Sequence, residues 1–205
     1  GELTQSWGGI FLAAGSVNAK DIAVYPIGTT SNWGGIRAKK YFAQKWFPND
    51  NAPKGTPADL SAAAGDDRCL LMTLEHELEI ANEDKFEEGY GYIKFLNTHA
   101  DGSEPHNAEH TDYDFPLFRL AEAYLTYAEA DARLNGGNIS ATGLNYIKEL
   151  RNRAHANANI SVFSLADIED EWSREFGFEG RRRLDMVRFG DFTGVRRIWI
   201  GGTTS

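Results

Sequence analysis

The sequence has little or none of several features that would assign it to a common class of protein. It contains one cysteine, Cys69, in the apolar run CLLM, which excludes a disulfide within the chain and predicts a buried free thiol. No apolar run is long enough to span a bilayer. Basic residues number 21 against 30 acidic ones, and the net charge of −9 disfavours nucleic acid as the main ligand, because binding phosphates requires a basic surface.

Sequence motifs of catalysis are also missing. There is no nucleophile elbow, no glycine-rich phosphate loop after a strand and no HExxH motif. A glycosidase needs two carboxylates held at a fixed separation across the scissile bond, and no pair stands out among the 30 acidic residues. We therefore predict that the protein is not an enzyme and requires no cofactor.

The second half of the chain shows helical periodicity. Residues 115–134 place apolar side chains at three- and four-residue steps, as one buried helical face requires. Pro116 falls in the first turn, where its missing N–H costs nothing, and the Asn-Gly-Gly sequence at 135–137 ends the helix. The apolar positions are Leu117, Leu120, Ala121, Tyr124, Ala128 and Ala132.

Two further helices are predicted after it. Ser140 is placed to cap a helix over residues 141–154, and Ser164 to cap a third helix with Asp167 at the capping-box position. Their inner faces comprise Leu144, Ile147 and Leu150 in the second helix, and Leu165, Ile168, Trp172 and Phe176 in the third. Small residues at the contact make the first two helices resemble a tetratricopeptide-type hairpin.

Charged residues of the third helix are expected to face solvent. These residues are Asp170, Glu171 and Arg174. The basic cluster at 181–183 is expected to form an ion-paired turn, because acidic side chains lie close to it in the sequence. Its predicted partners are Glu171, Glu175 and Glu179.

The first half of the chain is rich in glycine, serine, asparagine and threonine. Residues 1–60 are predicted to form loops with short extended pieces, apart from a helix over about 38–47. Residues 69–80 and 90–97 are predicted strands, which we expect to pair across an acidic turn at 83–88.

The fold class predicted from these patterns is mostly α. A tetratricopeptide-like helical hairpin forms its core, with a loop-rich insert and a small amount of β. We expect a loop-rich region with short strands over residues 1–111 and a helical region over residues 112–205.

Aromatic side chains in the glycine-rich loops suggest a sugar-binding surface. Trp7 and Trp33 lie in the near copies SWGG and NWGG, and Tyr25 lies in VYPIG. A ring on such a loop can stack on the apolar face of a sugar while polar neighbours bind its hydroxyls. The candidate polar partners are Asn32, Arg37, Asn18 and Asp21. The alternative is that either tryptophan fills space beneath its loop.

Asp112 and Asp114 form a DxD pair directly before the first predicted helix. A turn can converge two such carboxylates on Ca²⁺, while Asp114 alone suits the N-cap of the helix. Weaker candidates for completing a calcium shell are Asp66, Asp67 and Glu75. The histidines at 76, 99 and 155 have no ligand spacing and are expected to be incidental.

The order of several motifs resembles one family. FPLFRLAEAYLTYAEA, ELRNRA and REFGFEGRRRLDMVRFG follow one another in the C-terminal half. Upstream, the resemblance continues through NWGGIRAKKYFAQKWFPNDNAP, AAGDDRCLLMT and KFEEGYGYIKFLN. Together these motifs resemble the RagB/SusD family and cover most of the chain.

The resemblance implies a surface-exposed lipoprotein of the Bacteroidota outer membrane. Such a protein binds glycan along an aromatic arc, has in some members a structural calcium near the DxD position, and delivers its ligand to a SusC-type TonB-dependent transporter. Similarity of TSNWGG and AAGDDR to starch-binding members favours an α-glucan. It also implies a longer protein with a lipid anchor and N-terminal helical repeats, of which this chain is a fragment. A tetratricopeptide-like protein–protein scaffold is the alternative, and a glycoside hydrolase is less favoured.

Overall fold

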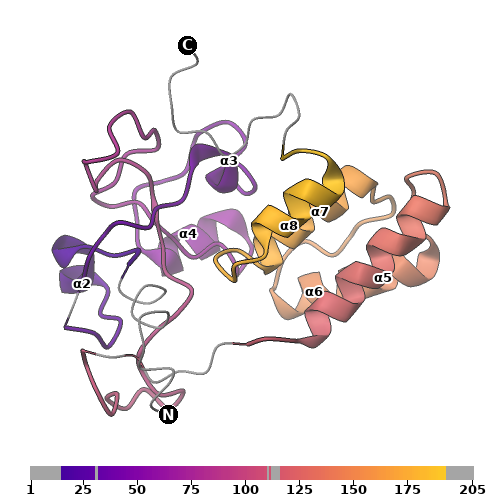
Figure 1. The fold of residues 1–205 in the computed structure, drawn as a ribbon. Helices are drawn as coiled ribbons and strands as arrows, with labels where there is room; N and C mark the ends of the chain where they lie inside the picture. The colour runs from indigo at the N-terminus through magenta and orange to yellow at the C-terminus, as the bar shows by residue number, and fades with distance from the viewer. Residues whose placement is uncertain (1–14, 31, 110, 112–115, 193–205) are drawn as a thin grey trace. The chain divides into compact units, whose positions relative to one another are not determined.

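The structure is a computed structural model in which residues 15–30, 32–109, 111 and 116–192 are described. These residues contain seven helices and one small sheet, so the predicted mostly helical fold class is confirmed (Figure 1). The chain divides into two compact units, and each is described separately below. Within the described ranges, unit 1 comprises residues 15–63 and 70–111, and unit 2 comprises residues 64–69 and 116–192.

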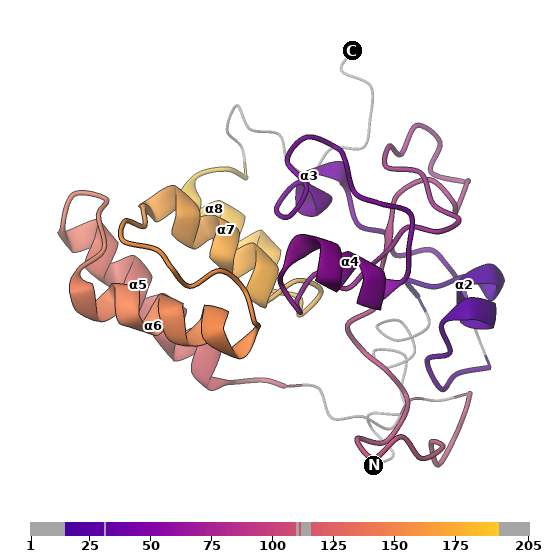
Figure 2. The ribbon, with the colours of Figure 1, turned by 180° about the vertical axis from the view of Figure 1, so that it is seen from behind.

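Long connections separate the elements of the first half of the chain, and shorter ones join the helices from α5 onward (Figures 1 and 2). The helices are α2 (Ala19–Val24), α3 (Lys40–Ala43), α4 (Pro57–Ala64), α5 (Leu120–Leu134), α6 (Ala141–Arg153), α7 (Leu165–Glu175) and α8 (Arg182–Phe189). The strands are β1 (Leu71–Met72) and β2 (Gly91–Tyr92).

Unit 1 is built around a two-stranded antiparallel sheet. Leu71 of β1 lies opposite Tyr92 of β2, and Met72 opposite Gly91, so the predicted strands do pair, although each is only two residues long. A buried apolar cluster forms beside the sheet from Val17, Ile27, Met72 and Ile93. The ring of Tyr92 also meets Phe42 edge-on, with 4.9 Å between the ring centroids.

The helices of unit 1 differ from the sequence-based expectation. The helix predicted over 38–47 is the four-residue α3. Residues 19–24, predicted as loop, form α2, because Asn18 and Asp21 make a reciprocal capping box that starts a helix without an apolar stripe. The eight-residue α4 was also not predicted, and among its residues only Pro57 and Leu60 are buried.

Unit 2 is a helical hairpin covered by two more helices. The hairpin helices α5 and α6 pack together, α7 packs on α5, and α8 follows beside α7 (Figures 1 and 2). Their shared core consists of Ala121, Leu125, Ala128, Ala132, Ile147, Leu150, Phe163, Ile168, Trp172 and Phe176. Cys69, in the short segment of unit 2 that precedes β1, is buried as predicted, and the chain has no second cysteine with which it could form a disulfide.

The start of α5 was predicted too early. The helix begins at Leu120 after an extended N-cap residue, Arg119, so neither Pro116 nor Asp114 stands at its start. Leu117 and Leu120, assigned to the buried face, are 78% and 65% exposed. The physical reason is that alanines and Leu125 form the buried face, since small side chains allow α6 and α7 to approach α5 closely.

The two predicted serine caps are confirmed. The Ser140 hydroxyl accepts the N–H of Gly143 at the start of α6. Ser164 and Asp167 form a complete capping box at α7, in which the Asp167 carboxylate accepts the Ser164 N–H at 2.8 Å. A carboxylate in this first turn also interacts favourably with the helix dipole.

The charged residues of α7 do not all face solvent. Glu171, predicted to be exposed, is fully buried, because Arg68, Arg151 and Arg174 all contact its carboxylate within 3 Å. Glu175, also buried, contacts Arg68, Arg119 and Arg153. Two of the buried carboxylates of α7, those of Glu171 and Glu175, are therefore each surrounded by three guanidinium groups.

The basic cluster at 181–183 is ion-paired, but it is not a turn and its partners differ from those predicted. Arg182 begins α8. Arg181 contacts Glu122 and Asp185, and Arg182 contacts Glu169 at 2.9 Å. The predicted partners Glu171 and Glu175 are instead surrounded by arginines from other parts of unit 2.

Candidate functional site

The segment around Trp33 is the candidate sugar-binding loop that the structure describes. The Trp33 side chain is 39% exposed. Gly34 has a φ of +62°, and a Cβ built on it would lie 3.4 Å from the Cβ of Asn18 and 3.5 Å from that of Phe86. The positive φ favours glycine in this turn, which lies beside the N-cap of α2, and the indole is partly exposed. After the turn, Ile36 donates its N–H to the Gly15 carbonyl at 2.7 Å.

Arg37 holds the neighbouring acidic loop. Its guanidinium group donates to the main-chain carbonyls of Glu83, Lys85 and Glu88, and it lies 5.6 Å from the ring centroid of Phe86. These contacts occupy both terminal nitrogens of the side chain. The structure therefore gives Arg37 a supporting position beside the Trp33 loop, and direct contact with sugar hydroxyls stays a prediction.

The other predicted glycan-binding residues occupy different settings. Asn32 precedes Trp33 and is partly buried. Tyr25 is partly buried and packs against the buried cluster of unit 1, and its contact with glycan stays a prediction. Asn18 caps α2 through its side chain. Trp7 lies outside the described residues, so its role stays a prediction.

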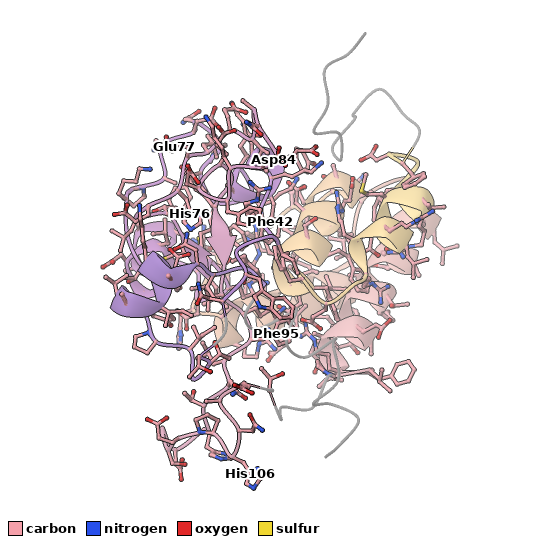
Figure 3. All side chains as sticks on the ribbon, turned by 60° about the vertical axis from the view of Figure 1, so that its left-hand side comes forward. Phe42, His76, Glu77, Asp84, Phe95 and His106 are labelled. Atoms are coloured by element: carbon pink, nitrogen blue, oxygen red, sulfur yellow. The ribbon has the colours of Figure 1, made fainter. Side chains whose placement is uncertain are left out.

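Unit 1 also contains a buried pair, His76 and Asp21, that the sequence did not indicate. His76, expected to be incidental, is 1% exposed and lies inside unit 1 (Figure 3). Its Nε2 lies 2.9 Å from the Asp21 carboxylate, and its Nδ1 lies 2.9 Å from the Gly89 carbonyl oxygen. Asp21 is fully buried and also accepts the N–H of Asn18 at 2.9 Å. The imidazole therefore links α2 to the segment before β2.

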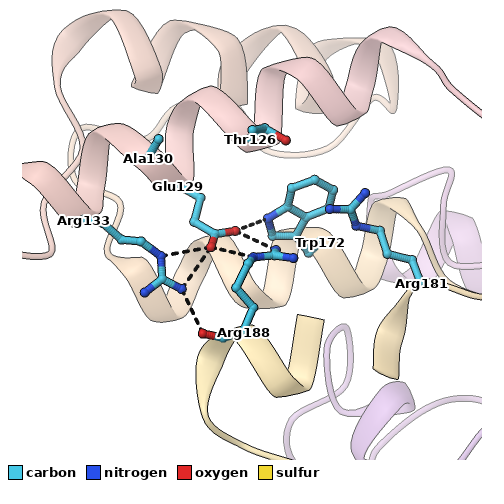
Figure 4. Close-up of a pocket in the computed structure, with 7 residues that line it drawn as sticks. All are labelled: Thr126, Glu129, Ala130, Arg133, Trp172, Arg181 and Arg188. Atoms are coloured by element: carbon cyan, nitrogen blue, oxygen red, sulfur yellow. Dashed lines mark hydrogen bonds and ion pairs between the residues drawn. The ribbon is translucent and has the colours of Figure 1, made fainter. Parts of the chain in front are cut away.

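Unit 2 contains a pocket of about 400 Å³ between α5, α7 and α8 (Figure 4). It is lined by Thr126, Glu129, Ala130, Arg133, Trp172, Arg181 and Arg188. The Glu129 carboxylate accepts hydrogen bonds from the indole N–H of Trp172 at 2.9 Å and from the guanidinium group of Arg188 at 2.7 Å. The Arg181 guanidinium carbon lies 3.8 Å from the centroid of the Trp172 ring.

The charged side chains that line this pocket form ion pairs with other residues of unit 2. Burial raises the pKa of Glu129, but hydrogen bonds and charge from Arg188 and Arg133 outweigh it, and the pKa falls below its usual range. Trp172 is 1% exposed and Arg181 stacks on its ring, so the ring is not open to a sugar. We interpret this pocket as part of the ion-paired packing of unit 2.

The predicted calcium ligands Asp112 and Asp114 lie outside the described residues, so this site stays a prediction. The weaker candidates have protein partners, since Asp66 contacts Arg68, Asp67 contacts His155 and Glu75 contacts Lys20. Within the described ranges, no group of three or more histidine, cysteine, aspartate or glutamate side chains is arranged to hold a metal ion. In the same residues, no helix combines the length and apolarity needed to cross a bilayer.

Comparison with known proteins identifies the family. The model of the SusD family matches residues 77–203, which is more than half of the chain. The chain belongs to the SusD family, and the resemblance carried by its motifs is confirmed.

Individual relatives agree with this assignment. The chain is 35% identical to the starch-binding protein SusD of Bacteroides thetaiotaomicron over 97% of its length and 40% of that relative. It is 32% identical to SusD-like protein P25 of Formosa agariphila over 58% of its length and 24% of that relative. A SusD-like protein of Bacteroides ovatus is 41% identical over 35% of this chain. The chain thus spans less than half of the starch-binding relative.

Proposed function

We propose that this chain forms part of a cell-surface glycan-binding protein that binds starch-like α-glucans without cleaving them. Two observations support the proposal. A relative similar over 97% of the chain is a starch-binding protein. The described loop also exposes part of an indole ring at Trp33, on a turn that needs glycine.

The proposed mechanism is stacking with hydroxyl pairing. The apolar face of a glucose ring lies on Trp33, and neighbouring polar groups, Asn32 foremost, bind hydroxyls. Each stack contributes on the order of 1 kcal/mol, as for other ring contacts, so micromolar or weaker affinity is expected for an oligosaccharide. Repeated contacts along a longer glycan then raise the affinity.

Titration calorimetry with maltoheptaose and cellohexaose tests this function. We expect binding of the α-linked oligomer and at least a fivefold loss on Trp33→Ala. Tyr127→Ala is the matched control, because Tyr127 of unit 2 is 45% exposed, close to the 39% of Trp33, and we expect it to leave binding unchanged. A folded protein that binds neither glycan would refute the proposal, and release of reducing sugar would show an enzyme instead.

The partners and location follow from the same proposal. We infer that the whole protein is an outer-membrane lipoprotein that passes glycan to a SusC-type TonB-dependent transporter. Membership of the SusD family supports this inference. Affinity purification of the tagged protein from its own outer membrane should recover a TonB-dependent transporter. Recovery of the tagged protein from that membrane without a transporter would contradict the inference.

A helical scaffold that binds a protein partner is the alternative function. One observation favours it: α5 exposes large apolar side chains on the side away from its core. These are Leu120 at 65%, Tyr127 at 45% and Leu134 at 86% exposed. The calorimetric experiment separates the two functions, since loss of glycan binding on Trp33→Ala is not expected of a peptide-binding scaffold.

A further inference from the structure

Phe86 is an exposed aromatic side chain on the acidic loop that Arg37 holds. The Phe86 side chain is 46% exposed, and its chain neighbours Lys85 and Glu87 are exposed as well. Among the described residues of unit 1, Phe86 and Trp33 are the two most exposed phenylalanine, tyrosine or tryptophan side chains. A single exposed ring is ordinary on a protein surface, so the position of Phe86 relative to Trp33 decides whether it has a role.

The two exposed rings come together at the Gly34 turn. A Cβ built on Gly34 would lie 3.5 Å from the Cβ of Phe86 and 3.6 Å from its Cδ2. Gly34 directly follows Trp33, and consecutive Cα atoms are about 3.8 Å apart, so the Cβ of Phe86 lies within about 9 Å of the Cα of Trp33. The two exposed side chains therefore start from neighbouring points of unit 1, although 53 residues separate them in the sequence.

Arg37 fixes the backbone on both sides of Phe86. Its guanidinium group donates to the carbonyl of Glu83 at 2.8 Å and to that of Glu88 at 2.7 Å. The guanidinium carbon also lies 5.6 Å from the centroid of the Phe86 ring, within the range of a cation–π contact. One side chain that directly follows the Trp33 turn thus supports both the loop and the ring that the loop carries.

Main-chain hydrogen bonds close the same loop at its ends. Glu77 donates its N–H to the carbonyl of Glu87 at 2.7 Å, and Gly89 donates its N–H to the carbonyl of Glu77 at 2.8 Å. The loop that carries Phe86 is therefore held in place before any ligand binds. Binding to a ring that is already positioned avoids part of the entropic cost of ordering a loop.

We propose that Phe86 is a second stacking residue for glycan, beside Trp33, and that it takes a further sugar unit of the same oligosaccharide. This proposal rests on the function proposed above. An aromatic ring offers a flat apolar surface to the C–H groups of a sugar face. Once one unit of the glycan lies on Trp33, contact of a second unit with Phe86 is intramolecular, so two rings raise the affinity more than one ring can. The surface thus selects oligosaccharides over single sugars.

Calorimetric titration with maltoheptaose tests the role of the ring. Phe86→Leu keeps an apolar side chain beside Gly34 but removes the flat ring, and we expect at least a threefold loss of affinity. Phe86→Tyr keeps the ring and should bind within twofold of wild type. Phe118→Leu is the matched control, because Phe118 of unit 2 is also exposed, at 88%, and its replacement should leave the affinity unchanged.

A purely structural role for Phe86 makes a different prediction. If the ring only supports its loop, Phe86→Leu should speed hydrogen–deuterium exchange in residues 83–88, whereas a stacking residue leaves that exchange as in wild type. In wild-type protein with bound maltoheptaose, we expect nuclear Overhauser contacts from glucose protons to the rings of both Trp33 and Phe86. Contacts to Trp33 alone would overturn the proposal, even if Phe86→Leu fails to fold.

The outcomes separate this proposal from the function on which it rests. Binding that is lost in Trp33→Ala but unchanged in Phe86→Leu would overturn the role of Phe86 and leave the glycan-binding function standing. Folded wild-type protein that binds no maltoheptaose would instead refute the proposed function, and the role of Phe86 with it.

Discussion

The polar contacts within unit 1 differ in kind from those within unit 2. In unit 2, guanidinium groups surround carboxylates on helices that already have an apolar core, as at Glu171, Glu175 and Glu129. In unit 1, side chains bind the main chain of loops, as Arg37 does for three carbonyls. His76 likewise binds a main-chain carbonyl.

This difference has a consequence for how each unit responds to change. A buried carboxylate that loses a guanidinium partner keeps its charge in an apolar interior, which is costly for the whole cooperative unit. A loop carbonyl that loses its donor can bind water instead. Substitutions in unit 2 should therefore lower global stability, whereas those in unit 1 should loosen the candidate binding loop locally.

The largest effect is expected for Arg68→Ala. Arg68 is buried and contacts Asp66, Glu171 and Glu175. Its removal leaves three buried negative charges with one positive partner fewer. We expect a loss of about 3–5 kcal/mol in the free energy of unfolding, as for other broken buried ion pairs. Urea denaturation followed by far-UV circular dichroism measures it.

Lys20→Ala is the matched control for that experiment. Lys20 pairs with Glu75 at the surface, with 73% and 52% of the two side chains exposed, and should change stability little. Equal effects of the two substitutions would remove the contrast between buried and exposed pairs.

The next effect concerns Glu171 and pH. Burial raises the pKa of this carboxyl, but the charges of Arg68, Arg174 and Arg151 outweigh it and bring the pKa to about 2. A carboxyl whose pKa is lowered by folding stabilises above its ordinary pKa, and this contribution, about 3 kcal/mol, is lost as the pH falls from about 4.5 to 2. Glu171→Gln should therefore be less stable than wild type at pH 7, and the difference should shrink by pH 2. A difference that is the same at pH 7 and pH 2.5 in urea titrations would show that Glu171 is not the responsible group.

A smaller and local effect is expected for Arg37→Met. The substitution removes the donors for the carbonyls of residues 83–88 but keeps an unbranched side chain, at a cost of about 1–2 kcal/mol. Hydrogen–deuterium exchange should become faster in residues 83–88 while the helices of unit 2 are unaffected. Faster exchange throughout unit 2 would break the contrast between local and global response.

The smallest effect on stability is expected for Gly34→Ala. The φ of +62° strains an alanine by about 1 kcal/mol, and its Cβ would meet Asn18 at 3.4 Å. We expect little change in the melting temperature but weaker maltoheptaose binding, since the turn carries Trp33. Gly136→Ala is a control with a similar φ of +67° and no atom within 4 Å of its Cβ. Equal loss of binding in both variants would exclude a specific role for the Gly34 turn.

Helices α5, α6 and α7 of unit 2 could be predicted from the sequence because periodicity and capping are local properties, whereas the start of α8 was predicted as a turn. Ser140 and Ser164 mark the starts of α6 and α7, and the spacing of Ile168 and Trp172 identifies a buried face. The burial of Glu171 could not be predicted this way. One of its partners, Arg68, lies 103 residues away in the sequence, and no local pattern reports such a contact.

The candidate site could be predicted only in part. Trp33, a tryptophan before two glycines, is 39% exposed, and its role in glycan binding stays a prediction. His76 had no recognisable signal, because its partner Asp21 is 55 residues away and the Gly89 contact is to main chain. Loops that are held by such contacts lack the hydrophobic periodicity from which helices are predicted.

The route of the chain between the two units limits how the protein can be divided. Residues 64–69 belong to unit 2, although residues on either side of them belong to unit 1. This short segment carries Arg68, the partner of Glu171 and Glu175. An excised piece starting at Pro116 would lose that guanidinium, so a stable separate helical domain requires residues 64–69 to be supplied in trans or joined through a linker.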